Sequence, residues 1–447
     1  MRLTILGGGG FRVPLVHQAL LVDREPGRVT DLVLYDLDPA RLAAIGNVLV
    51  RQEAGVADPP KITITTDLGE ALLGADFVFS AIRVGGLEGR VTDEQVALEA
   101  GVLGQETVGA GGIAYGLRTV PVALDIARRV AELAPEAWLI NFTNPAGMVT
   151  EAMSPYLGDR VIGICDSPVG LGRRVARALG VDPEAAWFDY AGLNHLGWLR
   201  GVRVGGSDHL PRLLDDPEAL VSFEEGKLFG ADWLRTLGAI PNEYLYYYYF
   251  TREAVAAARD APKSRGAVLT EQQRRFYRAA WREPESALDA WESARIEREA
   301  TYGAESREAA GAGSRDPYDL TSGGYEKVAL ALMRAIAHNE RTTLILNVRN
   351  HTTLSILDSD AVVEVPCVVD AAGPRPVVIE QLPDYAQALV CGVKAVERAV
   401  IEAATHGSRT AAVKALAIHP LIDSVTVARR ILDGYLAKIP QLAYLRP

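Results

Sequence analysis

Two side chains that can bind a metal ion, Cys165 and His195, lie 30 residues apart, and each has a polar neighbour. Cys165 ends the apolar run VIGIC and precedes Asp166, whereas His195 follows Asn194 in the segment GLNHLGW. Thiolate and imidazole groups are both metal ligands, but this pair has no established zinc spacing. A buried cysteine at a strand end is also a common apolar core residue. These residues alone leave a metal site and a structural role both open.

Arginines, glycines and tyrosines offer further chemistry. Arg83 and Arg90 flank the sequence VGGLEG, and a guanidinium group suits a phosphate or carboxylate, although most surface arginines are solvated. A glycine-rich run at 109–112 fits either a loop that wraps a ligand or a mobile turn. The tyrosines of YLYYYYF at 244–250 are core or interface residues by default. A tyrosine beside a cation and partly desolvated can instead act as a base.

A glycine-rich turn follows the first predicted strand, at 3–6. Gly7 and Gly9 fit the start of the G-x-G-x-x-G pattern and Gly10 follows them, but Arg12 stands where the third glycine is usual. A helical pattern comes next, so the turn directs backbone N–H groups at a phosphate. A tight turn that binds no ligand would also require glycines, so the glycine cluster by itself is weak support for nucleotide binding.

A carboxylate at the end of the second strand strengthens this interpretation. The strand DLVLY at 31–35 ends at Asp36, where an acid can accept hydrogen bonds from ribose hydroxyls. With strand, turn, helix and acid in this order, the sequence predicts dinucleotide binding.

The elements that must position these side chains alternate between strand and helix. Further strands are predicted at 61–67, 75–83, 136–142 and 160–165, with helical patterns between them at 88–99 and 117–133. Repeated βα units predict a parallel sheet covered on both faces, and ligands bind beyond the carboxyl ends of such strands. We therefore expect one shared location for the residues at or near these ends: Arg83, Asn141, Asn144 and Cys165.

The pattern changes after about residue 170. Residues 188–204 predict antiparallel strands around a turn, 348–369 read as strand material, and 384–438 are mostly helical. The interval 302–324 is rich in glycine, serine and charges and is predicted to be a mobile loop. We expect an α/β protein with two domains: a Rossmann-like NAD-binding domain at 1–170 and a domain for substrate, metal and oligomerisation at 171–447.

Composition excludes several classes of protein. The 447 residues carry a net charge of −11, which argues against broad nucleic-acid binding. No run approaches the roughly 20 apolar residues that a membrane span needs. The N-terminal LTIL leads into glycines and lacks a signal-peptide cleavage site. The three cysteines (Cys165, Cys367 and Cys391) lie far apart and give no disulfide framework, so we expect a reducing cytoplasm.

Six motifs in order resemble glycoside hydrolase family 4: the glycines after the first strand, RVGGLEGR, GQETVGAGGIAYGLRT, NFTNPAGMVTEA, GICDSP and GLNHLGW. The similarity is dense over the first 200 residues and looser beyond them. Within the family the chain most resembles the NAD- and manganese-dependent 6-phospho-β-glucosidases. The resemblance implies a second domain like the mixed α+β C-terminal domain of lactate and malate dehydrogenases. It also implies a homodimer or homotetramer.

The resemblance assigns roles to the candidate residues. Mn²⁺ would be held by Cys165 and His195 with substrate oxygens completing its shell, although thiolate is an unusual ligand for this hard ion. Tyr244 would act as the base, and Asp166 resembles a general acid. The implied NAD contacts are Gly7, Gly9, Gly10, Arg12, Asp36 and Arg83, and the implied substrate contacts are Arg90, Asn144 and Asn194.

The implied reaction hydrolyses 6-phospho-β-glucosides to glucose 6-phosphate and the aglycone. NAD⁺ takes hydride from C3, and the metal-polarised ketone makes the C2 proton acidic enough for a side-chain base. Loss of that proton expels the aglycone from C1; water then adds, and the hydride returns. This sequence of oxidation, elimination, addition and reduction differs from the two-carboxylate scheme of most glycosidases.

Three alternatives stay open. The first is a 6-phospho-α-glucosidase of the same family. Asp166 follows Cys165, as is common in that branch, whereas phospho-β-glucosidases often have Asn at this position. The motifs NPAGMVTEA and GLNHLGW, however, look more like the β branch. A 2-hydroxy-acid dehydrogenase would share the Rossmann sheet and the Asn-Pro at a strand end. It would need a G-x-H-G-like catalytic histidine and no metal. A non-catalytic module that senses NAD or a sugar phosphate would have little reason to keep Cys165, His195 and Tyr244.

Overall fold

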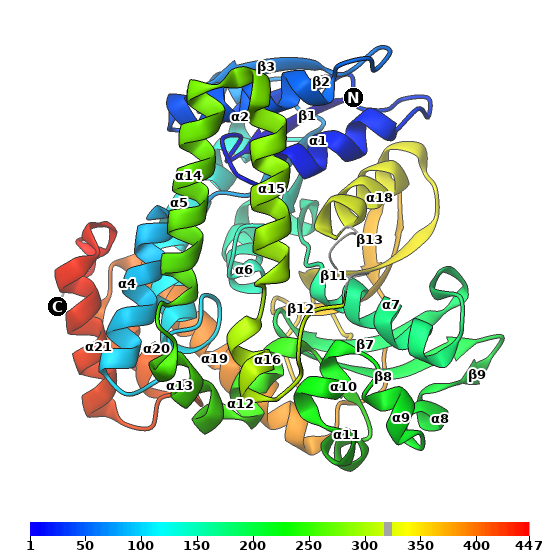
Figure 1. Cartoon of the computed structure of the whole chain (residues 1–447), viewed down its shortest axis with the longest axis vertical. Helices are drawn as coiled ribbons and strands as arrows, with labels where there is room; N and C mark the ends of the chain where they lie inside the picture. Colours follow the sequence, from blue (N-terminus) through cyan, green and yellow to red (C-terminus); the bar gives the residue numbers. More distant parts are fainter. Residues whose placement is uncertain (317–323, 447) are drawn as a thin grey trace.

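The computed structural model describes residues 1–316 and 324–446, and its first half alternates strands with helices (Figure 1). The strands before residue 170 are β1 (Arg2–Leu6), β2 (Asp31–Tyr35), β3 (Lys61–Thr65), β4 (Phe77–Ser80), β5 (Trp138–Asn141) and β6 (Val161–Gly163). They pair in parallel in the order β3-β2-β1-β4-β5-β6. Every strand predicted in this half is present, and the Rossmann-type order is confirmed.

The remaining strands extend the same sheet with antiparallel pairs. They are β7 (Trp187–Leu193), β8 (Leu196–Val204), β9 (Ser207–Asp208), β10 (Ile240–Pro241), β11 (Thr342–Arg349), β12 (Val362–Asp370) and β13 (Gly373–Pro376). Within the described residues the strands make one 13-stranded sheet, because β11 pairs with β6 at Asn347 and Gly163. The sheet therefore crosses the predicted boundary at residue 170, and the division into domains stays a prediction.

Helices cover the sheet and build the C-terminal region. Those of the first half are α1 (Val13–Val22), α2 (Pro39–Gln52), α3 (Leu68–Leu72), α4 (Gly86–Glu99), α5 (Gly109–Leu133), α6 (Ala146–Leu157) and α7 (Ser167–Leu179). The later ones are α8 (Leu210–Leu214), α9 (Pro217–Leu220), α10 (Glu224–Phe229), α11 (Ala231–Leu237), α12 (Tyr246–Tyr249), α13 (Thr251–Asp260), α14 (Arg265–Arg282), α15 (Ala287–Ala300), α16 (Ala304–Ala309), α18 (Tyr325–His338), α19 (Asp384–His406), α20 (Arg409–Ala417) and α21 (Val425–Lys438). In the described part of the chain, no helix has both the length and the apolar character of a membrane span.

The helices α14 and α15 lie side by side next to α2, far along the chain from the glycine turn that they reach (Figure 1). Tyr277 of α14 donates a hydrogen bond to the carbonyl oxygen of Gly9 at 2.7 Å. Trp291 of α15 is fully buried and donates its indole N–H to the carbonyl oxygen of Phe11 at 2.8 Å. Side chains from the second half of the chain therefore fix the glycine turn in the first half.

The glycine-rich run at 109–112 is the first turn of α5, so neither sequence interpretation of it, as a wrapping loop or a mobile turn, is correct. A Cβ atom on Gly111 would lie 2.1 Å from the carbonyl oxygen of Gln105, and one on Gly112 would lie 2.4 Å from that of Thr107. The absent side chains let α5 press against the segment that carries Thr107. Local sequence cannot distinguish this close packing from a flexible turn.

Two further expectations need correction. The interval 302–324, predicted to be a mobile loop, contains helix α16; its positions 317–323 lie outside the described residues. The segment 348–369 is not continuous strand, because β11 ends at Arg349 and β12 begins at Val362. Asn350 accounts for the turn between them, since its amide donates to three backbone carbonyl oxygens of the turn.

The two residues Asn194 and His195 form the turn between β7 and β8. His195 adopts a φ of +61°, a left-handed conformation that non-glycine residues rarely adopt. Asn194 ties this turn to the start of α6, because its Oδ1 accepts a hydrogen bond from the backbone N–H of Ala146 at 3.2 Å. A strained conformation that is held in this way commonly marks a functional position.

Glu364 of β12 anchors the same turn from inside the sheet. Its carboxylate accepts hydrogen bonds from the side chains of Asn194 (3.3 Å), Asn347 (2.8 Å) and Tyr190 (3.2 Å). Glu364 has no solvent exposure, and this burial raises its pKa to about 7. A titratable carboxyl group therefore lies directly behind the turn that carries His195.

We expect Trp291→Ala to lower the free energy of unfolding by about 3–5 kcal/mol, because it empties a buried site and removes the hydrogen bond to Phe11. Chemical denaturation measures this loss. The matched control is Trp281→Ala on α14, where the side chain is 62% exposed and the change should stay within about 0.5 kcal/mol. Equal losses in both variants would contradict the packing role of Trp291.

Glu364 should make stability depend on pH. Its pKa is higher in the folded protein than in the unfolded chain, so its contribution to stability is complete below the unfolded pKa and is lost as pH rises through about 7. Glu364→Gln keeps an oxygen that can accept from Asn194 and Asn347, and its NH2 group can donate to the Tyr190 oxygen, but it cannot ionise. The variant should therefore gain up to about 3 kcal/mol of unfolding free energy relative to wild type between about pH 5 and about pH 8. A difference between the two proteins that does not change with pH would contradict the assignment.

Candidate active site

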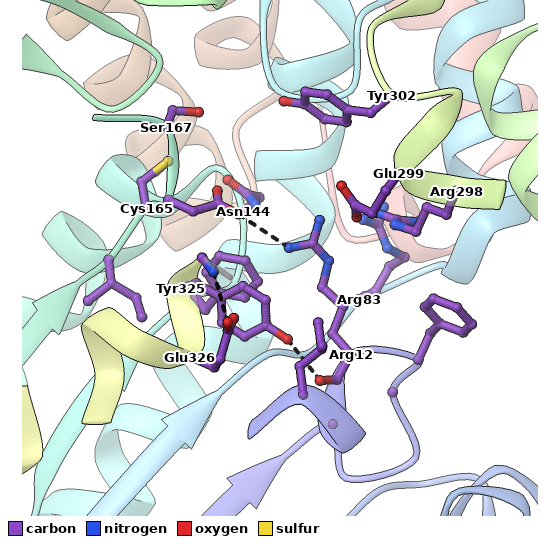
Figure 2. Close-up of a pocket in the computed structure, with 18 of the residues that line it drawn as sticks. Arg12, Arg83, Asn144, Cys165, Ser167, Arg298, Glu299, Tyr302, Tyr325 and Glu326 are labelled. Carbon is purple, nitrogen blue, oxygen red and sulfur yellow. Dashed lines mark hydrogen bonds and ion pairs between the residues drawn. The ribbon is translucent and has the colours of Figure 1, made fainter. Parts of the chain in front are cut away.

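A cavity of about 910 Å³ lies beyond the carboxyl ends of the parallel strands (Figure 2). Residues that follow five of these strands line it: Gly7 after β1, Asp36 after β2, Arg83 after β4, Asn144 after β5 and Cys165 after β6. Of the four residues expected to share this edge of the sheet, Arg83, Asn144 and Cys165 line the cavity. Asn141 ends β5 but is buried outside the cavity lining, where its amide donates to groups of residues 143–150. The later half of the chain closes the cavity with His195, Tyr244, Arg298, Tyr302 and Tyr325.

The turn after β1 has the geometry of a dinucleotide site. Gly7 has a φ of +86°, and a Cβ atom there would lie 2.6 Å from the carbonyl oxygen of Ala81. The backbone N–H of Gly9 donates to Oδ2 of Asp36 at 3.0 Å, which fixes this carboxylate at the end of β2. Gly10 and Asp36 both line the cavity. Turn, helix N-terminus and acid are thus placed together, as a bound pyrophosphate and ribose require.

Arg12 connects this turn to the opposite wall of the cavity. Its guanidinium lies over the rings of Tyr325 (5.1 Å) and Phe142 (5.6 Å), and Figure 2 shows it beside Tyr325. The Tyr325 hydroxyl donates to the Arg12 carbonyl oxygen at 2.8 Å. Nη1 of Arg12 lies 3.6 Å from Oδ2 of Asp166. The residue in the third glycine position therefore adds a cation between the nucleotide turn and Asp166.

Cys165 and His195 line the same cavity. Nδ1 of His195 is hydrogen-bonded to the Thr107 hydroxyl at 2.7 Å, which leaves Nε2 for a ligand. Burial lowers the pKa of His195 to about 3, so its imidazole is neutral, as metal binding requires. Burial, together with the charges of Glu364 and Asp166, raises the pKa of Cys165 well above its usual value. A thiolate at this position therefore needs a cation beside it.

These two side chains fit a metal ion that is completed by a bound molecule. Among the described residues, no group of three or more His, Cys, Asp and Glu side chains could hold a metal ion. An ion held by Cys165 and His195 would take its remaining ligands from oxygens in the cavity, such as the hydroxyls of a sugar. The donor set therefore suits an ion that binds together with its substrate.

Two arginines of the VGGLEG region share one carboxylate. Glu106 forms ion pairs with Arg83 and with Arg90, the latter at 2.7 Å, and Arg90 also pairs with Glu94 at 2.7 Å. Although burial opposes ionisation, Arg83 and Arg90 hold the pKa of Glu106 well below its usual value. Arg83 lines the cavity, whereas Arg90 is buried in this network.

Tyr244 is the tyrosine of 244–249 that lines the cavity. Its ring stacks on the His195 imidazole with centroids 3.7 Å apart and an angle of 7°. Its hydroxyl lies 2.9 Å from that of Tyr302. Burial raises the pKa of Tyr244 well above 10, and the neighbouring Tyr302 and Glu243 raise it further. The other tyrosines of the segment are engaged elsewhere: Tyr249, for example, accepts a hydrogen bond from Trp198.

The structure thus brings together most of the residues that the sequence singles out. The cavity lining includes Gly7, Gly10, Arg12, Asp36, Arg83, Asn144, Cys165, Asp166, His195 and Tyr244. Gly9, Arg90 and Asn194 lie outside the set of described residues that line it. They hold Asp36, Glu106 and the His195 turn respectively, and direct ligand contacts for them stay predictions.

Several residues of the site were missed by the sequence reasoning. Glu106 and Thr107 fall within the quoted motif GQETVGAGGIAYGLRT, so their polar character was a signal that could have been used. Tyr302 lies in the interval that was predicted to be a mobile loop, and Glu364 in a segment that was treated only as strand. For these two, only the folded structure reveals the contact.

Known proteins resemble this chain in fold and in sequence. Malate dehydrogenase from Plasmodium falciparum shares the fold, with a TM-score of 0.50 at 12% identity over 91% of this chain and 99% of that one. This likeness confirms the predicted architecture, a Rossmann-type sheet with a mixed C-terminal region.

Closer relatives cover nearly the whole chain. A probable 6-phospho-beta-glucosidase from Bacillus subtilis is 33% identical over 99% of this chain and 98% of its own length. The 6-phospho-beta glucosidase from Thermotoga maritima, solved with manganese, NAD⁺ and glucose-6-phosphate, has a TM-score of 0.82 at 26% identity, with 98% of both chains covered. A 6-phospho-alpha-glucosidase from gut microorganisms, solved with NAD and Mn²⁺, has a TM-score of 0.81 at 26% identity, again with 98% of both covered.

The family assignment follows from matches along the sequence. Residues 2–181 match the family described as "Family 4 glycosyl hydrolase", and residues 190–422 match the "Family 4 glycosyl hydrolase C-terminal domain". These two matches span most of the chain, and the whole-length relatives agree with them. The chain therefore belongs to family 4 of the glycosyl hydrolases.

Proposed function

We propose that this protein hydrolyses 6-phospho-β-glucosides to glucose 6-phosphate and an aglycone, with NAD and Mn²⁺ as cofactors. The observation that supports the proposal is one cavity whose lining includes Cys165 and His195 as well as Gly7, Gly10 and Asp36. Solved relatives that contain NAD, manganese and glucose-6-phosphate support it. A homodimer or homotetramer stays a prediction from the family resemblance.

Both cofactors would bind in this one cavity. The turn at Gly7–Gly10 and the Asp36 carboxylate would hold NAD, and Cys165 and His195 would hold Mn²⁺. When bound, the two supply a hydride acceptor and a Lewis acid, which together make the proton at C2 of the sugar acidic. Thr107 orients the His195 ring for this purpose, because its hydroxyl engages Nδ1.

Two side chains of the cavity would move protons. Tyr244 lies against His195 and would remove the C2 proton through its phenol oxygen. Its raised pKa means that it needs a nearby cation to act as a base, and a metal ion on His195 would supply one. Asp166 lines the cavity and would give a proton to the leaving aglycone oxygen.

A guanidinium group on the cavity wall would receive the phosphate of the substrate. Arg298 lines the cavity, as do Arg12 and Arg83, which are expected to contact NAD. Burial and the charges of Arg12 and Arg265 lower the pKa of Arg298 to about 9, so an anion beside it would be stabilised. Arg90, expected from the resemblance to clamp the phosphate, is already paired with Glu94 and Glu106. Asn144 would contact a sugar hydroxyl.

A second candidate is a 6-phospho-α-glucosidase of the same family. Asp166, the residue that the resemblance associates with this branch, lines the cavity with a partly exposed carboxylate. A 6-phospho-alpha-glucosidase from Leptotrichia buccalis is 29% identical over 96% of this chain and 96% of its own length. The two anomers therefore need a direct comparison.

We expect p-nitrophenyl 6-phospho-β-glucoside to be cleaved when NAD⁺, Mn²⁺ and a reductant are present, because the residues that fit both cofactors line one cavity. Release of p-nitrophenol measures turnover, and the α-linked isomer is the matched comparison. Preferential cleavage of the α isomer would establish the second candidate. Full activity after exhaustive removal of metal and nucleotide would overturn the cofactor requirement.

We expect Cys165→Ser to reduce turnover below detection while NAD⁺ affinity stays within about twofold of wild type, because a hydroxyl is a far weaker ligand than a thiolate. Calorimetric titration with NAD⁺ provides the second measurement. The buried Cys367 of β12 offers a matched control, since its thiol donates only to the Val365 carbonyl oxygen and Cys367→Ser should retain activity. Unchanged turnover in Cys165→Ser would remove this residue from the site.

A further inference from the structure

Four side chains form a connected set of hydroxyl and carboxylate groups on one wall of the cavity. The hydroxyls of Tyr244 and Tyr302 lie 2.9 Å apart, and Tyr302 donates to Oε1 of Glu243 at 3.5 Å. Ser167 donates to the same Oε1 at 2.6 Å. All four residues line the cavity, and Figure 2 shows the hydroxyls of Ser167 and Tyr302 turned toward one another.

These groups come from three separate parts of the chain. Glu243 and Tyr244 follow β10, Ser167 begins α7, and Tyr302 follows α15. The Asn242 side chain fixes the backbone of the first pair, because its Oδ1 accepts from the N–H of Tyr244 at 2.8 Å. The set therefore forms only when the chain is folded, and the Tyr244 hydroxyl is held by a residue from another part of the chain, Tyr302.

Tyr302 is itself held on its other side. The guanidinium of Arg315 lies 4.8 Å from the centre of its ring, and Arg315 is ion-paired with Glu299 of α15 at 2.7 Å. Since a cation over an aromatic face is attractive, this contact restrains the ring that presents the hydroxyl to Tyr244. The Tyr302 hydroxyl is thus fixed in place but can rotate its proton.

That rotation matches what a catalytic tyrosine needs. Tyr244 can donate to the Tyr302 oxygen, in which case Tyr302 donates to Glu243. In the opposite arrangement Tyr302 donates to Tyr244, since either hydroxyl of this pair can be the donor. Glu243 keeps the Ser167 hydrogen bond in both cases. The phenol oxygen of Tyr244 therefore keeps a partner in either state, and its position over the cavity is retained.

We propose that Tyr302 and Glu243 are positioning residues for Tyr244, which hold its phenol oxygen where it can reach the C2 proton of the substrate. The inference rests on the proposed function, in which Tyr244 is the base. A base that is displaced by a fraction of an ångström loses much of its rate advantage, whereas substrate binding is less sensitive to such a shift. The family resemblance assigns no role to Tyr302 or Glu243.

The test compares Tyr302→Phe with wild type at about pH 8, above the pKa of about 7 to which burial raises Glu243. The change removes one oxygen and keeps the ring under Arg315. We expect kcat to fall about 10- to 100-fold with KM within about threefold, because positioning acts on the proton transfer. With substrate deuterated at C2, the isotope effect on kcat should be at least as large as in wild type. NAD⁺ affinity should be unchanged.

Two further variants sharpen the comparison. Glu243→Gln keeps an oxygen that can accept from Tyr302 and Ser167, so its loss of kcat should be smaller than that of Tyr302→Phe. The control is Tyr247→Phe, since Tyr247 neighbours Tyr244 but its hydroxyl is hydrogen-bonded to Ser306 at 3.3 Å. This control should keep kcat within about twofold, because the hydrogen bond that is lost does not involve Tyr244, Tyr302 or Glu243.

Several outcomes would overturn the proposal. One is a kcat for Tyr302→Phe within twofold of wild type, and another is a fall in kcat with loss of the isotope effect. If Tyr302→Phe abolished exchange of the C2 proton with solvent while Tyr244→Phe retained it, Tyr302 would be the base. Wild-type protein without turnover of any 6-phosphoglucoside would overturn the proposed function and, with it, this role of Tyr302.

Discussion

The hydrogen bonds that hold the Asn194–His195 turn are the constraint on which the site depends. The His195 ring can face the cavity only because the backbone accepts a φ of +61° there, which costs about 1–3 kcal/mol for such a residue. Asn194, Glu364 and Thr107 stabilise this conformation from three sides. These contacts join the turn to the start of α6, to β12 and to the segment before α5, so the imidazole is in place only when helix, hairpin and sheet are assembled together.

The charged groups of the cavity are also held by contacts between separate segments of the chain. Glu106 neutralises part of the Arg83 and Arg90 pair, and the next residue, Thr107, orients His195. The segment that carries both is pressed against α5 by the close packing of Gly111 and Gly112. One short stretch of chain thus links the arginine network to the histidine, and a shift of this stretch would disturb both. The backbone at residues 106–107 thus connects the ion pairs of Glu106 with the close packing against α5.

The sequence was informative where structure depends on neighbours along the chain. Apolar runs that end in glycine or polar residues identify strands, and parallel strands gather their carboxyl ends, so Arg83, Asn144 and Cys165 could be placed together in advance. Tyr302 and Glu364 could not be found this way, because their roles arise from contacts with residues 58 and 170 positions away. The run at 109–112 was misread for a related reason: glycines permit flexibility and close packing alike.

The pair α14 and α15 has a consequence for how the protein is divided. Tyr277 and Trp291 bond to the carbonyl oxygens of Gly9 and Phe11, so the glycine turn at the start of the chain is held by side chains from beyond residue 270. The Rossmann-like half is consequently not a module that could be transplanted with these contacts intact. In evolutionary terms, substitutions in these two helices can change the support of the glycine turn without altering any of its own residues.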